Sequence, residues 1–97
     1  MASVGGIGTA TIDFGATAAT EASVAVADAT ITADAYIEPW IMARTTVDNS
    51  AEDHQQAAAF MRVVASEPVV GVGFTITAYC LHGYAVGTFK VDWTWSD

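Results

Sequence analysis

The segment at residues 88–95, TFKVDWTW, decides the fold class of this chain. Apolar and polar side chains alternate along it at every second position, a period typical of a β-strand with one face in a core. The apolar face consists of Phe89, Val91, Trp93 and Trp95. We expect at least one of the two tryptophans to lie in the core, because aromatic side chains bury large apolar areas.

Five further segments alternate in the same way, so the chain has six predicted strands. The other five are residues 9–14, 21–27, 35–44, 58–65 and 74–80. Short strands separated by turn residues favour a sandwich or a barrel over a parallel α/β sheet, which needs helices between its strands. The sequence therefore predicts an all-β fold, a six-stranded antiparallel β-sandwich. At 97 residues the chain has room for one such domain, and residues 1–8 are expected to form an extended N-terminal arm.

Glycine and proline mark the predicted interruptions. The segments 5–8 (GGIG), 71–73 (GVG) and 81–84 (LHGY) are expected to form turns. Pro39 cannot donate a hydrogen bond to a neighbouring strand, because it has no backbone N–H. Its strand is therefore expected to lie at a sheet edge or to contain a bulge.

The polar stretch at residues 47–57 does not alternate. Ser50 can cap a helix there, with Asp53 three residues further on. A short helical turn within residues 50–58 and a polar loop both agree with this pattern. The sequence leaves these two alternatives open.

Composition excludes several classes of function. The formal net charge is −8 with only three basic residues, so no basic patch for nucleic acid can form. Although 53% of the residues are hydrophobic, polar residues interrupt every run well before the roughly 20 residues that a membrane-spanning helix needs. The first residues lack the basic and apolar regions of a signal peptide, so synthesis in a cytoplasm is expected.

The candidates for chemistry are few. Cys80 is the only cysteine, which excludes an intrachain disulfide, and we expect it to be a small buried hydrophobe. The densest group of potential metal ligands, Asp48, Glu52, Asp53 and His54, does not match a calcium loop and is expected to be a solvated loop face. His54 and His82 occur in no metal-binding or catalytic spacing. We therefore expect no enzyme, cofactor or metal site.

One predicted strand carries a candidate interface. Along residues 35–44, one face combines aromatic, charged and aliphatic side chains, and such mixed faces suit contacts between subunits. The residues on this face are Tyr36, Glu38, Trp40, Met42 and Arg44.

The blocks along the chain are residues 10–15 (ATIDFG), 37–43 (IEPWIMA), a polar stretch containing His54, 73–78 (GFTITA) and 87–95 (GTFKVDWTW). The order of these blocks resembles small virion proteins of tailed bacteriophages. The last two blocks also resemble the closing strands of H-type lectin domains. These domains are six-stranded antiparallel sandwiches that assemble as trimers or hexamers.

The phage resemblance implies a structural component of a virion, either a capsid decoration (cement) protein or a neck or tail protein. Such a protein would be made in the cytoplasm of a bacterial host. It would act through contacts between copies, as a trimer or hexamer, and with a capsid or tail neighbour. The lectin resemblance implies the alternative, a glycan-binding module of a tail or fibre that recognises a host polysaccharide. Near the last turn, its candidate contacts are His82, Tyr84 and Asp92.

Overall fold

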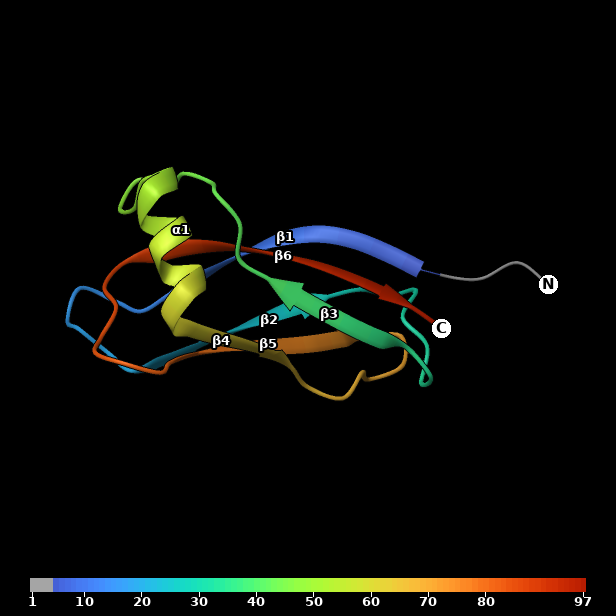
Figure 1. Cartoon of the computed structure of the whole chain (residues 1–97). Coiled ribbons are helices and arrows are strands. Elements are labelled where there is room, and N and C mark those ends of the chain that lie inside the picture. The colour runs from blue at the N-terminus through green and yellow to red at the C-terminus, as the bar shows by residue number, and fades with distance from the viewer. Residues whose placement is uncertain (1–4) are drawn as a thin grey trace.

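The computed structural model describes residues 5–97, which form six strands and one helix (Figure 1). The elements are β1 (Gly5–Asp13), β2 (Glu21–Ala27), β3 (Tyr36–Trp40), α1 (Ala51–Phe60), β4 (Met61–Ala65), β5 (Gly73–Cys80) and β6 (Thr88–Ser96). The strands form two antiparallel sheets with the orders β1-β6-β3 and β2-β5-β4. The two sheets face each other as layers, which confirms the predicted antiparallel β-sandwich.

The core lies between the inner faces of the two sheets. Every second residue of each central strand points inward, and the whole apolar face predicted for residues 88–95 is buried. Trp95 is 1% exposed, and the ring of Trp93 meets the ring of Phe74 edge-on at a centroid distance of 5.3 Å. Because Phe74 belongs to β5, this contact joins the two layers.

The glycines at residues 5–8 form the first half of β1, so the prediction of a turn and an arm there was wrong. Gly6 lies opposite Trp95 and Gly8 lies opposite Trp93. A Cβ atom on Gly8 would lie 2.5 Å from Cζ2 of Trp93, closer than van der Waals contact allows. Glycine is therefore needed in this strand because the two indole rings occupy the space of its side chains. Residues 1–4 of the predicted arm lie outside the described residues.

Two predicted strands are shorter in the structure than the alternation indicated. The strand predicted for residues 35–44 ends at Trp40, and residues 58–60 belong to the helix instead of to β4. β3 borders its sheet, which confirms the edge position predicted from Pro39.

The open alternative at residues 50–58 resolves as a ten-residue helix. The Ser50 hydroxyl accepts a hydrogen bond from the Asp53 N–H at 3.2 Å, and the Asp53 carboxylate accepts one from the Ser50 N–H at 2.9 Å. This reciprocal capping box satisfies two backbone donors at the start of the helix. The helix leads directly into β4 (Figure 1).

Side chains take the place of β3 along the first residues of β6. The Thr88 carbonyl accepts hydrogen bonds from the Thr46 hydroxyl and the Asn49 amide, both at 2.8 Å. The Thr88 N–H donates to the Asp48 carboxylate at 2.9 Å, and the next N–H on this edge, that of Lys90, donates to Nε2 of His54 at 2.9 Å. Side chains of the connection and of α1 therefore pair with the Thr88 N–H and C=O and with the Lys90 N–H, which β3 is too short to reach.

Candidate functional site

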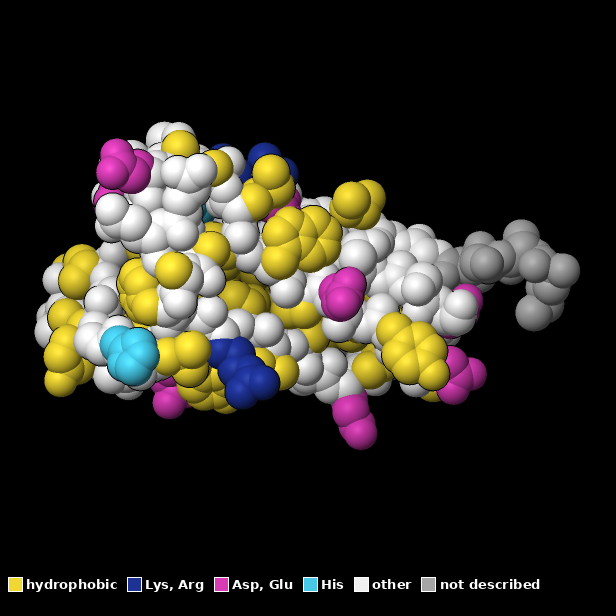
Figure 2. Space-filling model, in the orientation of Figure 1, with side chains coloured by type: hydrophobic (Ala, Val, Ile, Leu, Met, Phe, Trp, Pro, Cys, Tyr) yellow, Lys and Arg dark blue, Asp and Glu magenta, His cyan; other side chains and the backbone are white. Residues whose placement is uncertain are grey.

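The outer side of β3 carries three of the five predicted interface residues. Tyr36, Glu38 and Trp40 alternate with inward-facing neighbours along the strand, and all three are exposed. Tyr36 is 80% exposed, and Met42, just beyond the strand, is 45% exposed. Figure 2 shows this side of the molecule, where hydrophobic side chains over β3 flank an acidic one. The structure thus places aromatic and acidic side chains on one accessible face of β3, with Met42 exposed just beyond the strand.

The fifth predicted interface residue, Arg44, reaches back over the sheet to Asp92. Its Nε donates to Oδ2 of Asp92 at 2.8 Å and its Nη2 donates to Oδ1 at 2.7 Å, which is a two-pronged ion pair. The Thr9 hydroxyl adds a hydrogen bond to Oδ1 at 2.6 Å. Burial disfavours the charged carboxylate, but the bonds from Arg44 and Thr9 outweigh it and hold the pKa of Asp92 below its ordinary value. The same pair raises the pKa of Arg44.

The three candidate glycan contacts do not form one site. His82 and Tyr84 lie exposed in the connection between β5 and β6, and Tyr84 is 69% exposed. Asp92 lies in the middle of β6, is 3% exposed and is already bonded to Arg44 and Thr9. Sequence reasoning grouped Asp92 with the last turn because of its position in the chain. It missed the partner Arg44, which lies 48 residues away.

The three carboxylates of the acidic group, Asp48, Glu52 and Asp53, are exposed as predicted, but its histidine is buried instead of solvated. His54 is 0% exposed, and its Nδ1 lies 2.9 Å from the Ser50 carbonyl oxygen while its Nε2 accepts from Lys90. This pattern requires a neutral imidazole with the proton on Nδ1. The ring also packs edge-on against Phe89, with centroids 5.1 Å apart. His54 therefore attaches α1 to β6.

No metal centre or reactive thiol emerges from the described residues. Within residues 5–97, no group of three or more His, Cys, Asp and Glu residues could hold a metal ion. Cys80 is half-buried, somewhat less enclosed than predicted, and burial raises the pKa of its thiol. A raised pKa leaves less of the nucleophilic thiolate at neutral pH.

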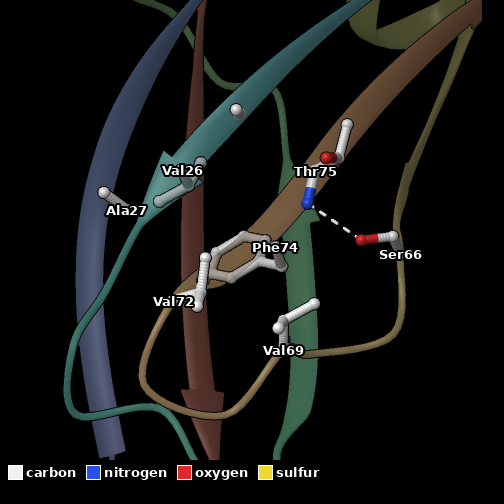
Figure 3. Close-up of a pocket in the computed structure, with 9 residues that line it drawn as sticks. Val26, Ala27, Ser66, Val69, Val72, Phe74 and Thr75 are labelled. Atoms are coloured by element: carbon white, nitrogen blue, oxygen red, sulfur yellow. Dashed lines mark hydrogen bonds between the residues drawn. The ribbon is translucent and has the colours of Figure 1, made fainter.

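An apolar hollow of about 250 Å³ opens at one end of the sheet β2-β5-β4 (Figure 3). Figure 3 shows the aliphatic side chains of Val26, Val69 and Val72 together with the ring of Phe74 around it. The Thr75 N–H donates to the Ser66 hydroxyl at 2.9 Å on its wall, and no ionisable side chain lines it. The hollow can therefore accept an apolar group but offers nothing for acid–base chemistry.

No protein-family model, curated protein or solved structure matches this chain. None of the helices that the structure describes is long and apolar enough to cross a membrane.

Proposed function

We propose that this chain is a structural component of a tailed-phage virion, as a capsid decoration protein or a neck or tail protein, and that it acts through contacts between subunits. The observation that carries the contact-making role is the exposed surface of β3, where Glu38 lies between Tyr36 and Trp40 and exposed Met42 follows just beyond the strand. Tyrosine, tryptophan and methionine are enriched in protein interfaces, where aromatic residues contribute most of the binding energy. The placement in a virion rests on the resemblance of the strand blocks.

The edge of β3 argues for contact through side chains. Pro39 has no N–H to offer to an incoming strand, so the edge is a poor template for sheet extension. A neighbour would therefore bind over the outer side chains and not alongside the backbone. The ion pair between Arg44 and Asp92 stiffens the segment that follows β3 and holds it against the sheet. We expect copies joined in this way to form trimers or hexamers, together with a capsid or tail protein.

Two exposed tyrosines allow a matched test of this proposal. Tyr36 on β3 and Tyr84 in the loop between β5 and β6 are both largely exposed, so Tyr36→Ser and Tyr84→Ser remove the same groups from different surfaces. Each variant would be co-sedimented with phage capsid or tail proteins, and its binding to host polysaccharide would be titrated. We expect Tyr36→Ser to weaken attachment to the particle protein at least about ten-fold and Tyr84→Ser to leave it unchanged.

The outcomes separate the proposal from the glycan alternative. Unchanged attachment in both Tyr36→Ser and Trp40→Ser would remove β3 as the contact surface. Binding to polysaccharide that is lost only in Tyr84→Ser would support the lectin-like function instead. Attachment to neither partner would contradict both.

A further inference from the structure

The second border of the sheet β1-β6-β3 differs from the border at β3. β1 pairs with β6 in one continuous register from Gly5 opposite Ser96 to Asp13 opposite Thr88, without a bulge. It is nine residues long and contains no proline, whereas β3 has five residues and Pro39. Proteins commonly block exposed edges with proline, charge, a bulge or short length. β1 has none of these devices between residues 5 and 12.

The outer backbone groups of β1 are free to pair with another strand. The Phe14 N–H donates to the Gly87 carbonyl at 2.9 Å, so the backbone groups of even-numbered residues point towards β6. Because successive residues of an antiparallel strand alternate in this respect, the N–H and C=O groups of Ile7, Thr9 and Thr11 point away from it. Within residues 5–97, no segment on that side forms a backbone hydrogen bond with these three residues.

The distribution of charge shows which partner this edge can accept. The chain carries a net charge of −8, yet residues 5–12 contain no ionisable side chain and Asp13 closes the strand at one end. If two β1 strands pair antiparallel about Thr9, Asp13 of each copy lies beside Gly5 of the other. The two Asp13 residues are then separated by about 26 Å, at a rise of about 3.3 Å per residue. This exceeds the screening length of roughly 8–10 Å in physiological salt, so the repulsion between them is small.

We infer that β1 pairs edge to edge with β1 of a second copy of this chain, antiparallel and about a two-fold axis at Thr9. In this arrangement, Ile7 of each copy lies opposite Thr11 of the other, and the outward N–H and C=O groups pair. The contact is self-complementary, as a two-fold interface requires. It joins two three-stranded sheets into one continuous sheet and brings a neighbour to Ile7, which is 76% exposed in the single chain.

This contact is independent of the proposed surface of β3, because it lies on the opposite border of the same sheet. A hexamer with both three-fold and two-fold axes can use both contacts, whereas a simple trimer has no place for the pairing of β1. The pairing can therefore fail while the contact through Tyr36 holds, and the reverse is equally possible.

Amide hydrogen exchange of the unmodified chain tests the pairing directly. The mass in solution would be measured by light scattering from about 1 to 500 µM, and amide exchange would be followed by NMR at both ends of that range. We expect the mass to reach an even multiple of the chain mass. The amides of Ile7, Thr9 and Thr11 should become protected as the mass rises, while those of Gly8 and Ala10 are protected throughout. Rapid exchange of the three outward amides at every concentration would overturn the inference, as would a mass that stays monomeric.

Two single proline substitutions, one on β1 and one on β4 as the control, give the second test. Thr11→Pro removes one outward N–H from β1, at an exposed position. The Ser66 N–H donates to the Thr75 carbonyl and therefore points towards β5. Because successive residues alternate, the Ala65 N–H points away from β5, and Ala65→Pro removes this outward N–H from β4. We expect Thr11→Pro to weaken self-association at least about ten-fold and Ala65→Pro to leave it unchanged. Circular dichroism would confirm that both variants fold, and equal self-association in the two variants would contradict the pairing.

Discussion

The edge of β6 that faces β3 is satisfied in two different ways. From Asp92 to Ser96, the partner is the backbone of β3, in a regular antiparallel ladder. From Thr88 to Lys90, the partners are side chains from the connection between β3 and α1 and from the helix itself. The first half pairs backbone with backbone, whereas the bonds to the Thr88 N–H and C=O and to the Lys90 N–H in the second half require particular side chains at particular positions.

This difference predicts where the fold is sensitive to substitution. A ladder uses backbone groups that every residue except proline carries, so an exposed side chain on β3 can change at low cost. A side-chain hydrogen bond disappears with its residue and leaves a buried backbone group without a partner. The half of β6 near the helix should therefore lose far more stability on mutation than the half beside β3.

The largest effect is expected from His54→Ala. The change removes a fully buried ring, leaves the Lys90 N–H without its acceptor and detaches α1 from β6. We expect a loss of about 3–5 kcal/mol in the free energy of unfolding, from the cavity and the unpaired groups together. Urea denaturation measures it, with His82→Ala as the control at an exposed position. A loss below about 1 kcal/mol would show that the helix is held by other contacts.

Asp92→Asn breaks the link between the two halves, because Asp92 lies in the ladder while Arg44 comes from the connection. We expect a loss of about 1.5–3 kcal/mol at pH 7, the range for hydrogen bonds to charged groups. Urea denaturation at pH 7 measures this loss. The same measurement at low pH tests the ionisation of the carboxylate.

The pH dependence follows from the lowered pKa of Asp92. A carboxylate with a lowered pKa in the folded state contributes stability above its unfolded pKa of about 3.9 and loses it as the pH falls through the folded value. The unfolding free energies of the wild type and Asp92→Asn should therefore begin to converge as the pH falls below about 4 and should meet below the lowered pKa of the folded state. Hydrogen bonds from Thr30 and Trp95 also lower the pKa of Asp28. The free energy of unfolding of Asp28→Asn should therefore fall less steeply than that of the wild type as the pH decreases through the same range. Parallel curves for the wild type and Asp92→Asn would contradict the assigned role.

A smaller effect is expected from Asn49→Ala. The Asn49 amide donates to the carbonyls of Thr88 at 2.8 Å and Val86 at 3.1 Å, next to other donors and close to solvent. Since the Thr46 hydroxyl still reaches Thr88, the expected loss is about 1 kcal/mol. Thermal unfolding would show it as a modest fall in Tm. The double variant with Thr46→Val should lose more than the sum of the two single changes.

The smallest effect is expected on the ladder side. Glu38→Ala alters an exposed side chain of β3 while its backbone pairing with Thr94 stays intact. The free energy of unfolding should change by no more than about 0.5 kcal/mol. Any larger loss would show that the ladder half also depends on its side chains. The comparison between the two halves would then fail.

Local pattern was sufficient where a residue's role depends on its neighbours in the chain. The alternation at residues 88–95 predicted the buried face of β6, and the spacing of Ser50 and Asp53 indicated the capping box of α1 as one of two alternatives. The same reasoning failed at Gly8, where a glycine that suggests a turn lies inside a strand. Glycine is needed at this position because of the ring of Trp93, which lies opposite Gly8 but 85 positions later in the chain.

The candidate surfaces also have some features that follow from local pattern and others that do not. Alternation placed Tyr36, Glu38 and Trp40 on one face, since that depends only on the period of a strand. It could not show that Arg44 leaves this face to bind Asp92, or that Ile7 and its neighbours border a sheet. Those facts depend on strand order and on which residues meet across the sheet.

The sequence by itself determined the all-β class and the apolar face of the last strand, and it indicated Ser50 as a possible helix cap, because side-chain period and capping are local properties. Only the tertiary structure decided that His54 is a buried connection between helix and sheet, that Asp92 is paired with Arg44 and that β1 borders its sheet. The physical reason is that hydrogen-bond partners and free edges are set by contacts between residues far apart in the chain, and the period of a single strand carries no information about them.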